Sequence, residues 1–166
     1  DRVLNDMKRG HTSGTYREIA GKIKERFADF TISTDIIVGF PTETEEEFQK
    51  TISLLDETKP DVVNLSKYSA RPGTEAAEWK QIDAFEVKRR TKIIFEQISK
   101  LSMESNQKWI GWKGKVLFDE MTDEGIKGRN FAYKPVSVVD EVNLGESHIV
   151  KITDASVKRL VGKIAS

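Results

Sequence analysis

The sequence predicts an α/β fold for about the first 106 residues, followed by a small antiparallel five-stranded β-barrel. Apolar runs typical of buried strands alternate with amphipathic helical patterns over residues 12–106, which indicates parallel βα units. Beyond residue 106 the pattern changes to short β-type runs at hairpin spacing. We therefore expect two domains, residues 1–106 and 107–166.

In the first domain we expect helices and strands in alternation. The predicted order is a helix at residues 12–28, a strand at 30–40, a helix at 44–57, a strand at 62–68 and a helix at 83–106. Thr15 with Glu18, and Thr44 with Glu47, have capping-box spacing. The apolar strands should be buried on both faces. Two βα units cannot close a barrel, so we expect part of a larger sheet whose edge is covered by upstream chain.

In the second domain the β-type runs fall at residues 113–121, 126–130, 133–139, 148–153 and 157–161. Residues rich in turn chemistry separate them, as at 140–145 and 153–155. Five short strands in about 60 residues predict a barrel of the oligonucleotide-binding kind.

Composition excludes several classes of site. Basic and acidic residues both number 27 in the 166-residue chain, so net charge indicates no particular partner. Cysteine is absent, which excludes disulfides and cysteine-ligated metals or clusters within this chain. His11 and His148 lack companions at ligand spacing, so we predict no metal site and no catalytic residue. No apolar run is long enough to span a membrane and the first residues lack a signal peptide, which favours a cytoplasmic protein.

Polar residues cluster where the two predicted parallel strands end. Asp35, Gly39 and Glu43 surround the carboxyl end of the first strand, where such sheets bind ligands. Arg71 lies in the loop after the second strand, and its guanidinium suits a carboxylate or phosphate. The alternative is structural: Gly39 makes a turn, Glu43 complements a helix dipole, and Arg71 is a surface residue of a Pro-Gly turn.

A second candidate site interleaves basic and aromatic residues over residues 127–134 (KGRNFAYK). Cations there can bind phosphates while Phe131 or Tyr133 stacks on an unpaired base. Alternatively the aromatic side chains belong to the core and the charges are solvated. Strand alternation predicts that one of the two aromatic residues is in the core, and Lys158 and Arg159 could extend the basic patch.

These motifs together resemble the radical S-adenosylmethionine tRNA methylthiotransferases, a MiaB-like family. The resemblance rests on residues 7–9 (MKR), 33–44 (STDIIVGFPTET), 68–74 (YSARPGT) and a tail similar to a TRAM domain with Gly128, Arg129, Pro135, Val136, Gly145 and residues 160–162. It covers nearly the whole chain. Residues 67–76 look most like the archaeal and eukaryotic branch, which modifies threonylcarbamoyladenosine. Thr42 departs from the family, which more usually has glycine there.

The resemblance implies the carboxyl-terminal portion of a partial (β/α) radical barrel followed by a TRAM domain. Its implied activity is methylthiolation of carbon 2 of N6-threonylcarbamoyladenosine next to the tRNA anticodon. Its implied cofactors are S-adenosylmethionine and two 4Fe-4S clusters, kept active by a reductant. The implied cofactor-binding residues are Ser33, Thr34, Asp35, Gly39, Glu43 and Arg71. The implied tRNA-binding residues are Lys127, Arg129, Asn130, Tyr133 and Lys134.

The cluster ligands of this family are cysteines, and the chain has none. We therefore expect a fragment that is inactive alone. One alternative is a stand-alone tRNA- or RNA-binding module without catalysis. Another is an unrelated barrel enzyme that uses Asp35 and Glu43 as acid and base.

Overall fold

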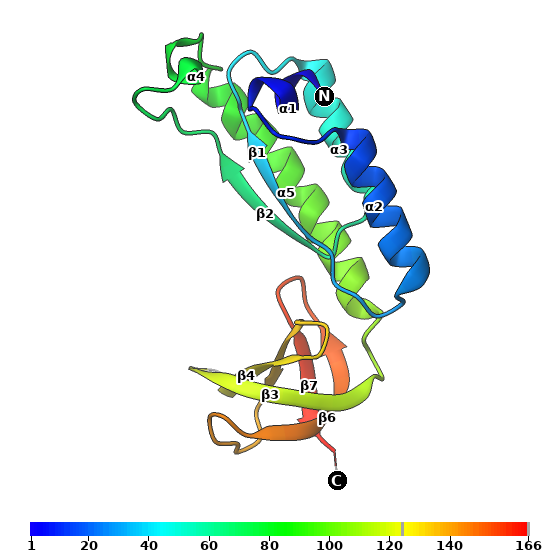
Figure 1. The fold of residues 1–166 in the computed structure, drawn as a ribbon. Helices are drawn as coiled ribbons and strands as arrows, with labels where there is room; N and C mark the ends of the chain where they lie inside the picture. Colours follow the sequence, from blue (N-terminus) through cyan, green and yellow to red (C-terminus); the bar gives the residue numbers. More distant parts are fainter. Residues whose placement is uncertain (124, 166) are drawn as a thin grey trace. The chain divides into compact units, whose positions relative to one another are not determined.

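The computed structural model describes residues 1–123 and 125–165. They form two compact units, residues 1–98 and the described residues from 99 onward. In the first unit the elements, in chain order, are α1 (Arg2–Asp6), α2 (Ser13–Arg26), β1 (Ser33–Val38), α3 (Glu45–Thr58), β2 (Val62–Lys67), α4 (Glu75–Glu78) and α5 (Ala84–Gln107), whose last turns belong to the second unit (Figure 1). The predicted alternation of helix and strand is confirmed, and α1 and α4 are additional short helices. None of the helices in the described part of the chain is long and apolar enough to cross a membrane.

The first residues of two helices test the capping boxes predicted from the sequence. Thr44 caps α3 and exchanges hydrogen bonds with Glu47, which confirms that capping box. The box predicted at Thr15 and Glu18 is wrong. Thr12 is the N-cap of α2, and its side chain accepts a hydrogen bond from the Thr15 amide at 3.1 Å. The helix therefore begins one turn before the predicted box.

Strands β1 and β2 pair in parallel, with Ser33 opposite Val62 and Val38 opposite Lys67. A core of Val38, Phe48 and Ile94, with partly buried apolar residues around it, joins the sheet to α3 and α5. The prediction that both strands are buried on both faces is wrong. Exposed residues alternate with half-buried ones along most of both strands, because the helices cover only one face of the sheet. Asp35 lies on the opposite, exposed face.

The second unit is a closed barrel of β3 (Lys113–Thr122), β4 (Gly125–Asn130), β5 (Pro135–Val138), β6 (Ser147–Ala155) and β7 (Leu160–Ile164) in the order β3-β4-β5-β7-β6. The five predicted strands are confirmed, but the antiparallel prediction is wrong for one pair. β5 and β7 run parallel, with Val136 opposite Leu160. Strand direction cannot alternate around a closed ring with an odd number of strands, so one neighbouring pair has to be parallel.

Inward residues of every strand fill this barrel. Val116, Phe118, Val136, Val150 and Leu160 are completely buried. Glycines permit close approach of neighbouring strands: a Cβ on Gly128 would lie 2.1 Å from the carbonyl oxygen of Leu117. The outer face carries many charged residues, together with exposed apolar side chains such as Leu117, Met121 and Ile149.

Candidate functional site

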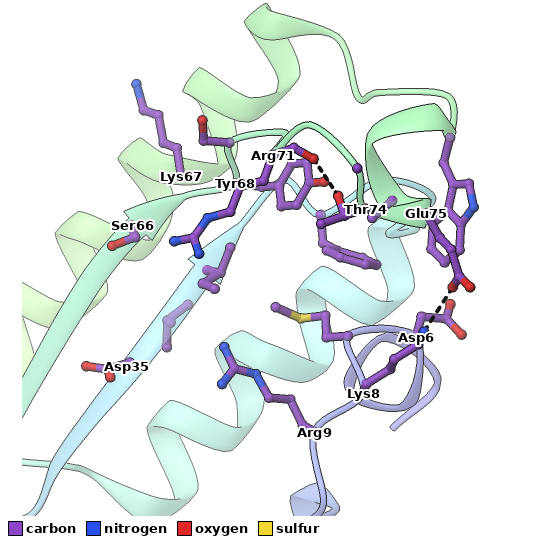
Figure 2. A pocket seen from close by; sticks show the side chains of 18 residues that line it. Asp6, Lys8, Arg9, Asp35, Ser66, Lys67, Tyr68, Arg71, Thr74 and Glu75 are labelled. Carbon is purple, nitrogen blue, oxygen red and sulfur yellow. Dashed lines mark hydrogen bonds and ion pairs between the residues drawn. The ribbon is translucent and has the colours of Figure 1, made fainter.

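A cavity of about 950 Å³ lies in the first unit, where β1 and β2 end (Figure 2). Three segments that are far apart in sequence line it: the loop with Met7, Lys8 and Arg9, the strand residues around Asp35, and residues 66–79. The parallel register brings the carboxyl ends of β1 and β2 to one edge, as predicted. The basic loop at residues 7–9 joins them because α1 and α2 hold it beside that edge.

Aromatic side chains form one wall of the cavity. Phe40 is buried and makes edge-to-face contacts with Tyr68, at a centroid distance of 5.3 Å, and with Trp79, at 5.9 Å. Such contacts fix ring positions through their quadrupoles. The site therefore combines a rigid apolar wall with an open polar side.

The cavity has an excess of unpaired positive charge. Lys8 pairs with Glu75 at 3.2 Å, and Asp35 accepts a hydrogen bond from Asn64 at 2.8 Å. No ion pair or hydrogen bond engages the side chains of Arg9, Lys67 and Arg71 among the described residues. Figure 2 shows the guanidinium groups of Arg9 and Arg71 directed into the hollow. This arrangement can bind a carboxylate or phosphate.

Of the six predicted cofactor-binding residues, Asp35 and Arg71 line the cavity. Ser33, Thr34, Gly39 and Glu43 are outside its lining. Lys67 and Trp79 line it but were missed by the sequence prediction. Lys67 ends β2 at the same edge as Arg71, which is a signal that could have identified it.

The contacts of Gly39 and Glu43 give both residues a structural role. Gly39 has φ +80°, and a Cβ there would lie 2.7 Å from a methyl group of Val87. Glycine thus permits both the turn and the close packing of α5. The Glu43 carboxylate lies 2.8 Å from the guanidinium of Arg90, and both side chains are buried. Burial raises the pKa of Glu43, while the hydrogen bond from Arg90 opposes that rise.

Arg90 also bonds Glu86 at 2.7 Å and the carbonyl oxygen of Glu43 at 3.1 Å. Hydrogen bonds from Arg89 and then Arg90 lower the pKa of Glu86 to about 2. Arg90 therefore ties α5 to the turn before α3.

The second candidate site lies on the barrel, at the β4–β5 turn. Tyr133 and Phe131 are 72% and 68% exposed, so the prediction that one of them is in the core is wrong. The Arg129 guanidinium lies over the Tyr133 ring at 4.7 Å. Phe131 contacts the rings of Trp109 and Trp112 at the barrel surface. The turn therefore presents aromatic surface beside a cation.

Two of the predicted RNA-binding side chains instead build this turn. Lys134 is 2% exposed, and its Nζ donates to Ser105 at 2.8 Å and to Asn106 at 3.1 Å. Asn130 is buried, and its Oδ1 accepts from the amides of Ala132 and Lys134. These contacts hold Tyr133 at φ +64°, an unfavourable value for a bulky residue. Lys127 is exposed enough to reach solvent but pairs with Glu120 at 2.7 Å.

Comparison with known proteins gives a consistent result, although no family model matches the sequence. The chain is 44% identical over 170 residues to the probable threonylcarbamoyladenosine tRNA methylthiotransferase of Archaeoglobus fulgidus, covering all of this chain and 39% of that protein. It is 43% identical over 164 residues to the protein of the same name from Methanocaldococcus jannaschii, covering 99% and 37%.

A bacterial relative carries a different name. The chain is 38% identical over 169 residues to the tRNA-2-methylthio-N(6)-dimethylallyladenosine synthase of Dictyoglomus thermophilum, covering 99% of this chain and 38% of that protein. The chain thus spans less than two fifths of the length of these relatives. Similarity at this level over essentially the whole chain shows that it belongs to the MiaB-like family of tRNA methylthiotransferases.

Proposed function

We propose that this chain is part of a tRNA methylthiotransferase that modifies N6-threonylcarbamoyladenosine next to the anticodon in the cytoplasm. One observation carries the proposal: the cavity gathers residues from all three segments of the first unit that resemble the family, including Arg9, Asp35 and Arg71. In this proposal β1 and β2 are two strands of a partial (β/α) barrel, and the second unit is an RNA-binding TRAM domain.

The cavity fits S-adenosylmethionine, which would supply a methyl group. Arg71 would bind the carboxylate of its methionine part, because a guanidinium offers paired donors to a carboxylate. Asp35 would accept hydrogen bonds from ribose hydroxyls or from the amino group. The Phe40 wall offers apolar contact to the adenine ring. Arg9 would then remain available for a phosphate of the tRNA.

Iron–sulfur clusters do not fit the residues of this chain. Cysteine is absent, and within the described ranges 1–123 and 125–165 there is no group of three or more metal-ligating side chains. We therefore assign no cluster, and no reductant-dependent step, to these residues.

The modified base is proposed from the relatives' names. Those at 43 and 44% identity are named for threonylcarbamoyladenosine, and the one at 38% for the dimethylallyl compound. On the barrel, Arg129 and Tyr133 would contact RNA, while Asn130 and Lys134 hold the turn that presents them.

Deletion of the gene tests this proposal. Mass spectrometry of digested tRNA should show loss of 2-methylthio-N6-threonylcarbamoyladenosine and accumulation of its precursor, with recovery when the gene is returned. An Arg71→Gln copy should restore much less of the modified base than the wild-type gene. Arg26→Gln, an exposed arginine of α2, is the matched control and should restore it fully. Unchanged modification in the deletion strain would refute the proposal.

A further inference from the structure

Three lysines form a row across the outer surface of the barrel. Lys113 of β3 is directly opposite Lys151 of β6, and Lys151 is directly opposite Lys163 of β7. All three side chains are exposed. Their neighbours Val150 and Ile152 point into the core, so strand alternation directs Lys151 and its partners outward. These three residues are named the lysine row, and β3, β6 and β7 can be followed in Figure 1.

Like charges directly opposite on neighbouring strands repel, so the row is unfavourable for folding. The same barrel contains the favourable arrangement elsewhere: Lys127 of β4 is opposite Glu120 of β3, with 2.7 Å between Nζ and the carboxylate. In the part of the chain that the structure describes, no carboxylate pairs with the lysine row. The nearby Asp140 accepts from the backbone amide of Ile164 instead.

Protection of a strand edge does not explain the row. Lysines often prevent pairing at exposed edges, but a closed barrel has no free edge. General solubility does not explain it either, because acidic residues are as numerous as basic ones in this chain and could have been interleaved. The barrel therefore holds three positive charges side by side although their mutual repulsion lowers its stability.

We propose that the lysine row binds consecutive phosphates of an RNA backbone. Two strand spacings separate its ends, about 10 Å in all, so the row presents a short line of positive charge rather than a point. Lysine ammonium groups suit phosphate binding without base recognition. Lys115, two residues along β3 on the same exposed side, widens the row toward Ile149. This inference rests on the proposed RNA-binding function and adds a backbone contact separate from the Arg129 turn.

The test compares two triple variants of the 166-residue chain that lose the same charge. Lys113→Gln/Lys151→Gln/Lys163→Gln removes the row. Lys50→Gln/Lys88→Gln/Lys92→Gln removes three exposed lysines from α3 and α5 and is the control. The probe is a synthetic tRNA anticodon stem–loop, and its affinity is measured from low to moderate salt. Circular dichroism checks that each variant is folded.

The row variant should bind more weakly. The negative slope of log affinity against log salt should become shallower by about 2, as expected for three lost contacts to single-stranded phosphates. The control should keep the wild-type slope, and a triple Lys→Arg variant of the row should retain binding. Equal slopes for the row variant and wild type would overturn the lysine row while leaving RNA binding intact. A wild-type chain that does not bind the stem–loop even at low salt would refute RNA binding itself, and the row with it.

Discussion

The guanidinium of Arg90 lies 2.8 Å from the carboxylate of Glu43, and the two side chains are only 5% and 7% exposed. This ion pair joins α5 to the turn between β1 and α3. Glu43 was predicted from sequence as a cofactor-binding residue, and its partner is 47 residues away in the chain.

Loss of the Arg90 side chain should strongly destabilise the first unit. In Arg90→Met the Glu43 carboxylate remains buried without its partner, which costs about 3–5 kcal/mol of unfolding free energy. Urea unfolding followed by circular dichroism at 222 nm measures this, because the helices lie mainly in that unit. The double variant Glu43→Leu/Arg90→Met should recover much of the loss. A cost below about 1 kcal/mol for Arg90→Met would show that the pair is not important for stability.

Thr42 should be a strained position that glycine relieves. Its φ is +70°, a left-handed value that costs an ordinary residue about 1–2 kcal/mol. Arg2 stabilises it by donating to the Thr42 carbonyl oxygen at 2.9 Å and to its hydroxyl at 3.1 Å. Thr42→Gly should raise the unfolding free energy, since only the hydroxyl contact is lost. Thr42→Val keeps the branched side chain and should lower it, so the two substitutions should shift the urea midpoint in opposite directions.

Acid should weaken the contact between α1 and α3. A hydrogen bond from Arg2 is the main cause that lowers the pKa of Glu47 from 4.5 to about 2. A lowered carboxyl pKa contributes stability above the unfolded value, and that contribution is lost as pH falls from about 4.5 to 2. Arg2→Gln should therefore lower the melting temperature at pH 6 and flatten its dependence on pH over this window. Arg26→Gln is the control; if it flattens the pH dependence equally, Arg2 is not responsible.

Substitution of Lys134 should affect the stability of the barrel, whereas substitution of Arg129 should affect RNA binding. Lys134→Met leaves the side-chain oxygens of Ser105 and Asn106 without the buried ammonium group, so it should destabilise the barrel by about 1–3 kcal/mol. Hydrogen exchange at the amides of Val136 and Val150 measures that loss. Arg129→Gln should leave exchange unchanged but weaken binding of the anticodon stem–loop. If Lys134→Met left hydrogen exchange unchanged but weakened stem–loop binding, Lys134 would be an RNA contact after all.

Local patterns in the sequence determined most of the architecture. The capping box at Thr44, the alternation of βα units and five short strands are confirmed because each depends on neighbouring residues. Similarity to the relatives bears out the family that the motifs at residues 7–9, 33–44 and 68–74 indicated.

Only the tertiary structure decided which side chains are available for function. Lys134 and Lys127 are the same residue type seven positions apart, yet Lys134 is buried against Ser105 and Lys127 lies at the surface beside Glu120. The parallel β5–β7 pair and the lysine row depend on which strands become neighbours when the barrel closes. Burial and cross-strand neighbours arise from contacts between residues distant in the chain, and such contacts leave no periodic signal in a single sequence.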